Sequence, residues 1–227
     1  MYEMVKIKTL TGKYEMVDVN KIIAYEDASG PWLYHVMMLA DNPELDGNFT
    51  LDSDDLATLI PPNYYVEKIY LEEHPIEEAR QMVLDGINEG AVLMNYFGHS
   101  GLDRLAQEGL LTTNDVNSLN NGEKLPITTA MSCVVGRFEI PGYNCLSEAM
   151  VLKSDGGAIA TWAPTGLCFN ADSKILAEYF YSDFLVGGEE SLGDVVLKAL
   201  EAYKNSDRDP NVLYLYNLLG DPVLLVR

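Results

Sequence analysis

Apolar positions along the chain alternate between short continuous runs and segments with helical spacing. The continuous runs are apolar and partly β-branched or aromatic, which is typical of buried strands. These runs are residues 32–40, 64–71, 91–97, 127–132 and 156–162, with further strand candidates at 1–10, 212–219 and 223–226. The segments with helical spacing are 18–26, 52–60, 75–89, 112–120, 145–153, 172–184 and 191–204. This alternation predicts an α/β fold, a three-layer α/β/α sandwich around a mostly parallel sheet, with an antiparallel edge strand at the end.

Two of the predicted strands lead directly to reactive side chains. The run 91–97 is followed by His99 after one glycine, and the run 127–132 is followed by Cys133. The helical pattern at 112–120 lies between them, so the unit is strand, helix, strand, and its two strands are parallel. Parallel neighbours lie about 4.8 Å apart and end at the same edge of the sheet. We therefore expect His99 and Cys133 to face one another across a crevice at that edge.

A cysteine beside a histidine suggests nucleophilic catalysis. A thiol is a useful nucleophile when it is reachable and has a proton acceptor nearby. A single cysteine or histidine at a strand end is more often a packing residue, so the inference rests on the joint placement of the pair. Cys145 begins an apolar helix face and is expected in the core. His35 and His74 have no evident partner and are expected to be packing or surface residues.

An acidic, turn-rich loop at 41–54 follows the strand 32–40 and should emerge at the same edge as His99. A carboxylate from this loop could orient the histidine or bind a cationic substrate side chain. Such a cluster could also hold a structural calcium ion, although its spacing is not that of the helix–loop–helix calcium site. A solvated turn followed by a helix cap explains the same residues equally well.

Composition narrows the choice of partners. The chain has 227 residues, enough for one substantial core, and a formal net charge of −20. This charge excludes nucleic acid and anionic membrane surfaces as partners and attracts cationic peptides, although solubility alone could also account for it. No apolar run reaches about 18 residues, and residues 1–10 alternate like a strand rather than a signal peptide. Three cysteines cannot all pair, so a disulfide framework is disfavoured.

Several motifs resemble the gingipain family of cysteine peptidases, which has the caspase-like fold. The similar segments are 20–26, 95–101, 131–138, 145–150 and 219–227. The likeness covers nearly the whole chain and keeps the order of the motifs. It implies a single caspase-like catalytic domain over residues 1–227, in which residues 1–30 form the junction with a preceding subdomain.

The resemblance also implies roles for individual residues. Cys133 would be the nucleophile, His99 the general acid and base, and Asp41 the acidic residue behind the histidine. The N–H groups of Cys133 and Ser100 would form the oxyanion hole. The residues expected to contact substrate are Asp52, Asp54, Ser100, Trp162 and Cys168.

Within that set, Asp52 takes the position of the carboxylate that pairs with the substrate's arginine in the family, and Asp54 is the near alternative. Ser100 is a departure, because the family has glycine directly after the histidine. Its side chain could turn an oxyanion N–H away or crowd the substrate.

These observations predict a cysteine endopeptidase that acts on peptides or proteins through a thioester acyl-enzyme, and the resemblance implies cleavage after a basic residue such as arginine. It would need no cofactor and, by the resemblance, would work outside the cell or in the cell envelope. The alternative is a weakly active or inactive pseudo-peptidase that serves as a binding or processing module, which Ser100 and the missing preceding subdomain favour. A hydrolase or transferase of small esters or amides is a third, more distant interpretation.

Overall fold

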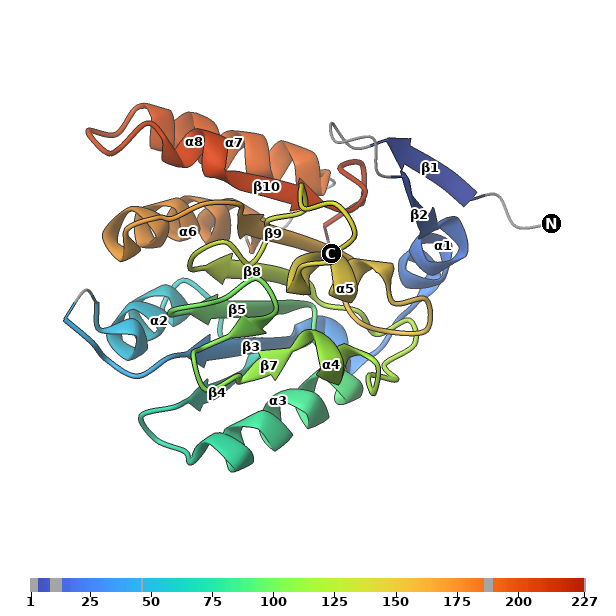
Figure 1. Cartoon of the computed structure of the whole chain (residues 1–227), viewed down its shortest axis with the longest axis horizontal. Helices are drawn as coiled ribbons and strands as arrows, with labels where there is room; N and C mark the ends of the chain where they lie inside the picture. The colour runs from blue at the N-terminus through green and yellow to red at the C-terminus, as the bar shows by residue number, and fades with distance from the viewer. Residues whose placement is uncertain (1–3, 9–13, 46, 186–189, 227) are drawn as a thin grey trace.

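A six-stranded sheet forms the centre of the computed structural model, which describes residues 4–8, 14–45, 47–185 and 190–226 (Figure 1). Its strand order is β10-β9-β8-β5-β3-β4, and all neighbours are parallel except β10, which is antiparallel to β9. The strands are β3 (His35–Ala40), β4 (Tyr65–Tyr70), β5 (Leu93–Phe97), β8 (Ile127–Met131), β9 (Ala160–Pro164) and β10 (Tyr216–Leu219). The predicted mostly parallel sheet with an antiparallel edge strand is confirmed.

Helices cover both faces of this sheet and bury a separate hydrophobic cluster on each. On one face lie α2 (Phe49–Ala57) and α6 (Asn170–Phe184), with α7 (Leu192–Lys204) packed against α6. The other face carries α3 (Ile76–Glu89), α4 (Thr113–Val116) and α5 (Leu146–Leu152). The predicted three-layer sandwich is thus confirmed; in Figure 1, α7 lies at the top of the view and α3 at the bottom.

Smaller elements lie around the sandwich. An antiparallel pair, β1 (Met4–Lys8) and β2 (Tyr14–Asp18), precedes α1 (Val19–Asp27). A two-residue ladder joins β6 (Arg104–Leu105) to β7 (Leu111–Thr112), and α8 (Val212–Leu215) leads into β10. The described residues do not include 1–3 and 9–10 of the first predicted strand, 46 of the acidic loop or 227 of the segment 219–227.

Several predicted boundaries differ from the structure. The run predicted as a strand over 32–40 begins as a 3-10 helix, η1 (Pro31–Tyr34), because Pro31 fixes a helical first turn. The helix predicted over 52–60 begins earlier, since the side chain of Asn48 accepts the Leu51 N–H at 3.1 Å and caps α2. Asp52 therefore lies in the first turn of α2 rather than before it.

The end of the chain also departs from the sequence prediction. The predicted strand over 212–219 divides into α8 and β10, and residues 223–226 form no strand but one isolated bridge between Ser191 and Leu225. The predicted helix over 112–120 is reduced to the single turn of α4. The strand predicted over 156–162 is displaced to 160–164, which places Trp162 in the middle of β9.

Candidate active site

The carboxyl ends of three parallel strands bring three loops together. Phe97 at the end of β5 is in register with Met131 at the end of β8, so His99 and Cys133 each follow two residues beyond a paired position. Ala40 at the end of β3 is paired with Phe97 as well. Asp41 therefore begins its loop beside His99, and its N–H donates to the Phe97 carbonyl at 2.9 Å. The predicted meeting of these loops at one sheet edge is confirmed.

Gly98 allows the loop after β5 to lie close to the loop after β3. Its φ of 153° lies in a region that favours glycine, and a Cβ added there would lie 2.4 Å from both Asp41 Cβ and Tyr96 Oη. A side chain at this position would push Asp41 away from the β5 end. Gly98 is thus required for the arrangement around His99.

Asp41 holds the backbone of His99 rather than its ring. One carboxylate oxygen accepts the His99 N–H at 3.1 Å and the Tyr96 hydroxyl at 3.2 Å, while the other accepts the Asn42 N–H at 2.8 Å. Burial raises the pKa of Asp41, and these hydrogen bonds offset only part of that effect. The contact of Asp41 with the His99 N–H fixes the main chain at His99.

The His99 ring is instead bordered by Glu44 and Phe49. Its Nε2 lies 3.5 Å from a carboxylate oxygen of Glu44, and the ring packs edge-to-face on Phe49 with centroids 5.3 Å apart. Glu44 was not among the residues singled out from the sequence. Its place in the acidic loop that follows β3 is the signal that could have identified it.

Cys133 is partly exposed, and its peptide group contacts Ser100. Ser100 Oγ accepts the Cys133 N–H at 3.1 Å and donates to the Cys133 carbonyl. The sulfur lies 3.7 Å from the carbonyl oxygen of Cys168. Burial raises the pKa of Cys168 to about 11 and that of Cys145 to about 12, so both are thiols at neutral pH. Cys145 is fully buried in the core, as expected.

The two carboxylates expected to bind a substrate's arginine already have lysine partners. Asp52 accepts from Lys174 Nζ at 2.9 Å and from Asn170 Nδ2 at 2.6 Å. Asp54 accepts from Lys68 Nζ at 2.6 Å and from the Tyr70 hydroxyl at 2.8 Å. Both carboxylates are thus engaged by lysines of the same chain.

Trp162 likewise does not reach the crevice. Its side chain is fully buried and packs on Phe180 and Tyr216, with ring centroids 4.9 and 5.5 Å apart. The expectation that Trp162 contacts substrate is therefore wrong. The physical reason is the displaced position of β9, which places this residue within the strand and its side chain in the core.

A cavity of about 200 Å³ opens beside Cys168. It is lined by Leu167, Cys168, Phe169, Asp172, Asp209, Val212 and Leu215. Leu167 and Phe169 are largely exposed at its rim, while Asp172, in the first turn of α6, is buried. A guanidinium nitrogen of Arg208 lies 3.8 Å from the Asp172 carboxylate. The cavity thus combines apolar walls with acidic groups next to the Cys133 loop.

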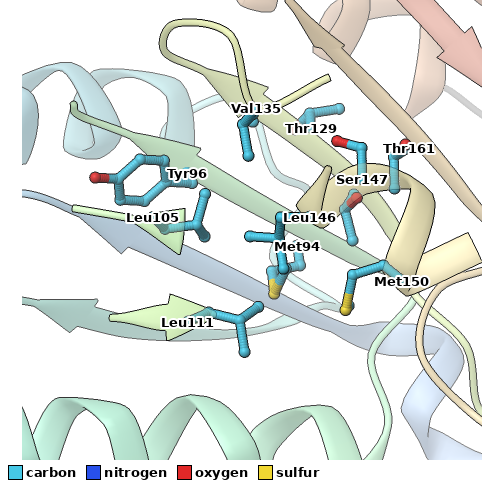
Figure 2. Close-up of a pocket in the computed structure, with 12 residues that line it drawn as sticks. Met94, Tyr96, Leu105, Leu111, Thr129, Val135, Leu146, Ser147, Met150 and Thr161 are labelled. Carbon is cyan, nitrogen blue, oxygen red and sulfur yellow. The ribbon is translucent and has the colours of Figure 1, made fainter. Parts of the chain in front are cut away.

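A second cavity lies inside the molecule, between the sheet and α5. Figure 2 shows its lining, with Met94 from β5 close to Leu146 from α5. Its volume of about 20 Å³ is enough for about one water molecule. It is an imperfection in core packing and too small for a substrate group.

Neither a metal site nor a membrane span is found in the part of the chain that the structure describes. In the ranges 4–8, 14–45, 47–185 and 190–226, no three histidine, cysteine, aspartate or glutamate side chains are grouped so as to hold a metal ion. Across the same ranges, no helix has both the length and the apolar composition required to traverse a bilayer.

Comparisons with solved structures place this geometry in a known fold. The chain is similar to the Arg-specific cysteine proteinase gingipain R (RgpB), with 22% identity and a TM-score of 0.79, covering 92% of this chain and 52% of that one. A complex of the pro- and mature domains of Porphyromonas gingivalis RgpB gives 21% identity and a TM-score of 0.78, with 92% and 53% covered. A structure described only as a protease gives 15% and 0.73, with 92% and 52% covered.

The chain therefore has the caspase-like fold of these proteins and spans about half of their length. No curated protein has a significant match to it. The family model for peptidase family C25 matches residues 16–227. This match covers nearly all of the chain and agrees with the motifs around His99 and Cys133. The chain belongs to peptidase family C25, the gingipain family of cysteine peptidases.

Proposed function

We propose that this chain is a cysteine endopeptidase in which Cys133 is the nucleophile and His99 the general acid and base. The observation that carries the proposal is the register of β5 and β8. It brings an imidazole and a partly exposed thiol to one sheet edge from two neighbouring parallel strands, in a chain of family C25. Open parallel sheets commonly bind and transform ligands at this edge.

In the proposed reaction, the Cys133 thiolate adds to the scissile carbonyl carbon, and the carbonyl oxygen takes up the electron pair. Collapse of this intermediate breaks the C–N bond, and His99 in its imidazolium form gives a proton to the leaving amine. Water then attacks the thioester, releases the acid product and restores the thiol. The Glu44 carboxylate lies 3.5 Å from Nε2 of this ring. No cofactor enters these steps.

The proposed substrates are peptides with a basic residue before the cleaved bond. The cavity beside Cys168 supports this preference, because apolar walls suit the stem of arginine or lysine and Asp172 suits its cationic end. The Arg208 guanidinium already lies near that carboxylate. Asp172 lines this cavity and Asp52 does not, so Asp172 is the proposed partner of the basic group. From its family we also propose that the protein acts outside the cell or in the cell envelope.

The test of this function is the Cys133→Ala variant assayed with an arginine-containing peptide. We expect hydrolysis to fall by about 10³-fold or more with unchanged circular dichroism, since the nucleophile is lost and the fold is not. Cys145→Ala is the matched control, because that thiol lies in the core, and its activity should stay within about twofold of the wild type. Undiminished turnover by Cys133→Ala would refute the proposal.

Active-site labelling distinguishes the pseudo-peptidase alternative. A peptidyl electrophile with arginine next to the reactive group should modify the wild-type chain once, at Cys133, and His99→Ala should slow the modification strongly. A wild-type chain that stays unlabelled, while its thiol reacts with small alkylating agents, would identify a binding module instead.

A further inference from the structure

Ser100 is the residue in the site whose side chain contacts the peptide group of the proposed nucleophile. It directly follows His99, and its hydroxyl lies between the loop that follows β5 and the loop that follows β8. Ser100 Oγ accepts the Cys133 N–H at 3.1 Å, and the hydroxyl proton is donated to the Cys133 carbonyl. Both hydrogen-bonding functions of this hydroxyl are thus engaged by the backbone of Cys133.

The other N–H groups of the same turn are engaged as well. The Val134 N–H donates to the Gly166 carbonyl at 3.1 Å, and the Val135 N–H donates to the Cys133 carbonyl. Val134 has a φ of 44°, a left-handed conformation that is unusual for a β-branched residue. The turn that carries Cys133 is therefore fixed by backbone bonds, whereas Ser100 can release its bond by rotating about one side-chain torsion.

The engaged N–H matters for the chemistry of a thiol nucleophile. Addition of the thiolate to a carbonyl places negative charge on an oxygen next to the nucleophile, where the N–H of the nucleophilic residue is a natural donor. A donor that already has an acceptor must lose that bond before it can stabilise the oxyanion. In this chain the competing acceptor is the Ser100 hydroxyl.

We propose that Ser100 is a latch that occupies the N–H of Cys133 in the free protein and must rotate away before the tetrahedral intermediate can form. The proposal rests on the proposed peptidase function. It makes the resting enzyme slower than its scaffold allows, because each acylation requires the loss of a hydrogen bond. It also assigns a role to the departure from glycine after the histidine.

Ser100→Ala removes the hydroxyl with little change in volume, and Ser100→Thr retains it. The first readout is the affinity of a peptide aldehyde with arginine at the reactive end. The Cys133 sulfur adds to its carbonyl carbon, forming a C–S bond, and the oxygen takes up the electron pair and then a proton. The second readout is alkylation of Cys133 by iodoacetamide, in which the sulfur displaces iodide and no oxyanion forms.

We expect Ser100→Ala to bind the aldehyde about three- to tenfold more tightly and to hydrolyse peptide faster by a similar factor. Its rate of alkylation should match the wild type, because that reaction does not need the N–H. Ser100→Thr retains the hydroxyl and should therefore bind the aldehyde less tightly than Ser100→Ala does. Ser118→Ala is the matched control, since that exposed hydroxyl also donates to a backbone carbonyl, at 2.7 Å from Asp115 O.

Three results would overturn the latch. Weaker aldehyde binding by Ser100→Ala with unchanged alkylation would make the hydroxyl an oxyanion donor. Equal binding by both proteins would show that the hydroxyl has no influence. If neither protein binds the aldehyde or cleaves peptide while Cys133 still alkylates, the peptidase function itself fails and the latch fails with it. Aldehyde binding gained only by Ser100→Ala would support a latch that holds the wild type inactive.

Discussion

At the scale of single residues, the site depends on the hydrogen bond between the Asp41 carboxylate and the His99 N–H. Asp41→Asn puts an amide NH₂ where a carboxylate oxygen now faces the N–H donors of His99 or Asn42. One of these donors would lose its acceptor, and the β5 end would shift. We expect kcat to fall about tenfold with little change in KM, since misplacement of a reacting group lowers the rate more than binding.

Steady-state kinetics on Asp41→Asn provide this measurement, and a melting curve provides its control. Burial raises the folded-state pKa of Asp41, so the ionised carboxylate costs stability at pH values above that pKa. The neutral amide avoids this cost, which partly compensates for the lost hydrogen bond. A variant that keeps full activity, or one that loses activity only because it is unfolded, would contradict the positioning role.

The residues that sequence reasoning could identify are those fixed by strand ends. Cys133 and Asp41 come directly after apolar runs, and His99 follows its run after one glycine. The topology of a parallel sheet brings such positions together. Sequence reasoning could not show that Asp52 pairs with Lys174, because that lysine comes from α6, far along the chain. The sequence also could not show the contact between Ser100 and the Cys133 peptide group, because this contact depends on a side-chain torsion.

At the scale of elements, the bounds predicted for long segments with a clear periodicity agree with the structure, whereas short elements could not be predicted. The predicted α3 and β5 agree with the structure to within two residues at each end, because burial of their apolar faces decides their conformation. The ladder of β6 and β7 has two residues per strand, too few for any periodicity. In α4, the Asp115 carboxylate accepts the Thr112 N–H and begins the helix, but the helix ends after one turn although Leu119 is still buried.

Strand pairing also supplies partners that the sequence did not indicate for His35. Its Nδ1 lies 2.8 Å from the Gly90 carbonyl and its Nε2 lies 3.1 Å from Glu67 on β4. Burial lowers the pKa of His35, but the hydrogen bonds to Glu67 and Gly90 and the nearby carboxylate charges outweigh burial, so the pKa is raised. The resulting stabilisation is present below the unfolded-state pKa, about 6.5, and is lost as pH rises through the folded-state value.

We therefore expect Glu67→Gln to lower the free energy of unfolding by about 1 kcal/mol at pH 6. The loss should be smaller at pH 8.5, because the charged pair contributes less as pH rises through the folded-state pKa of His35. Urea unfolding at the two pH values measures the difference. Glu78→Gln is the control. Glu78 is exposed and lies four residues after its partner His74, which is partly exposed, with 3.3 Å between nitrogen and oxygen. A Glu67→Gln effect that does not change with pH would rule out the charged pair.

At the scale of the whole molecule, the alternation of strands and helices was enough to predict the order of the layers. The assignment to the caspase-like fold also needed the motifs around His99 and Cys133.

The net charge of −20 is a property of the whole molecule that no single contact explains. Its field extends about 10 Å beyond the surface at moderate salt and raises the local concentration of cationic peptides. Asp172 acts differently, because it lies in the cavity wall and would contact a bound basic group directly.

These two contributions can be separated with one pair of peptides, which carry arginine or its neutral analogue citrulline before the cleaved bond. For the arginine peptide we expect kcat/KM to fall by about threefold or more as ionic strength rises from roughly 20 to 200 mM, while the citrulline peptide changes little. Asp172→Asn should lower kcat/KM for the arginine peptide by about tenfold at every ionic strength and leave the salt dependence unchanged. Equal salt dependence for both peptides would exclude steering by the net charge, and full activity of Asp172→Asn would remove this cavity from the recognition of basic residues.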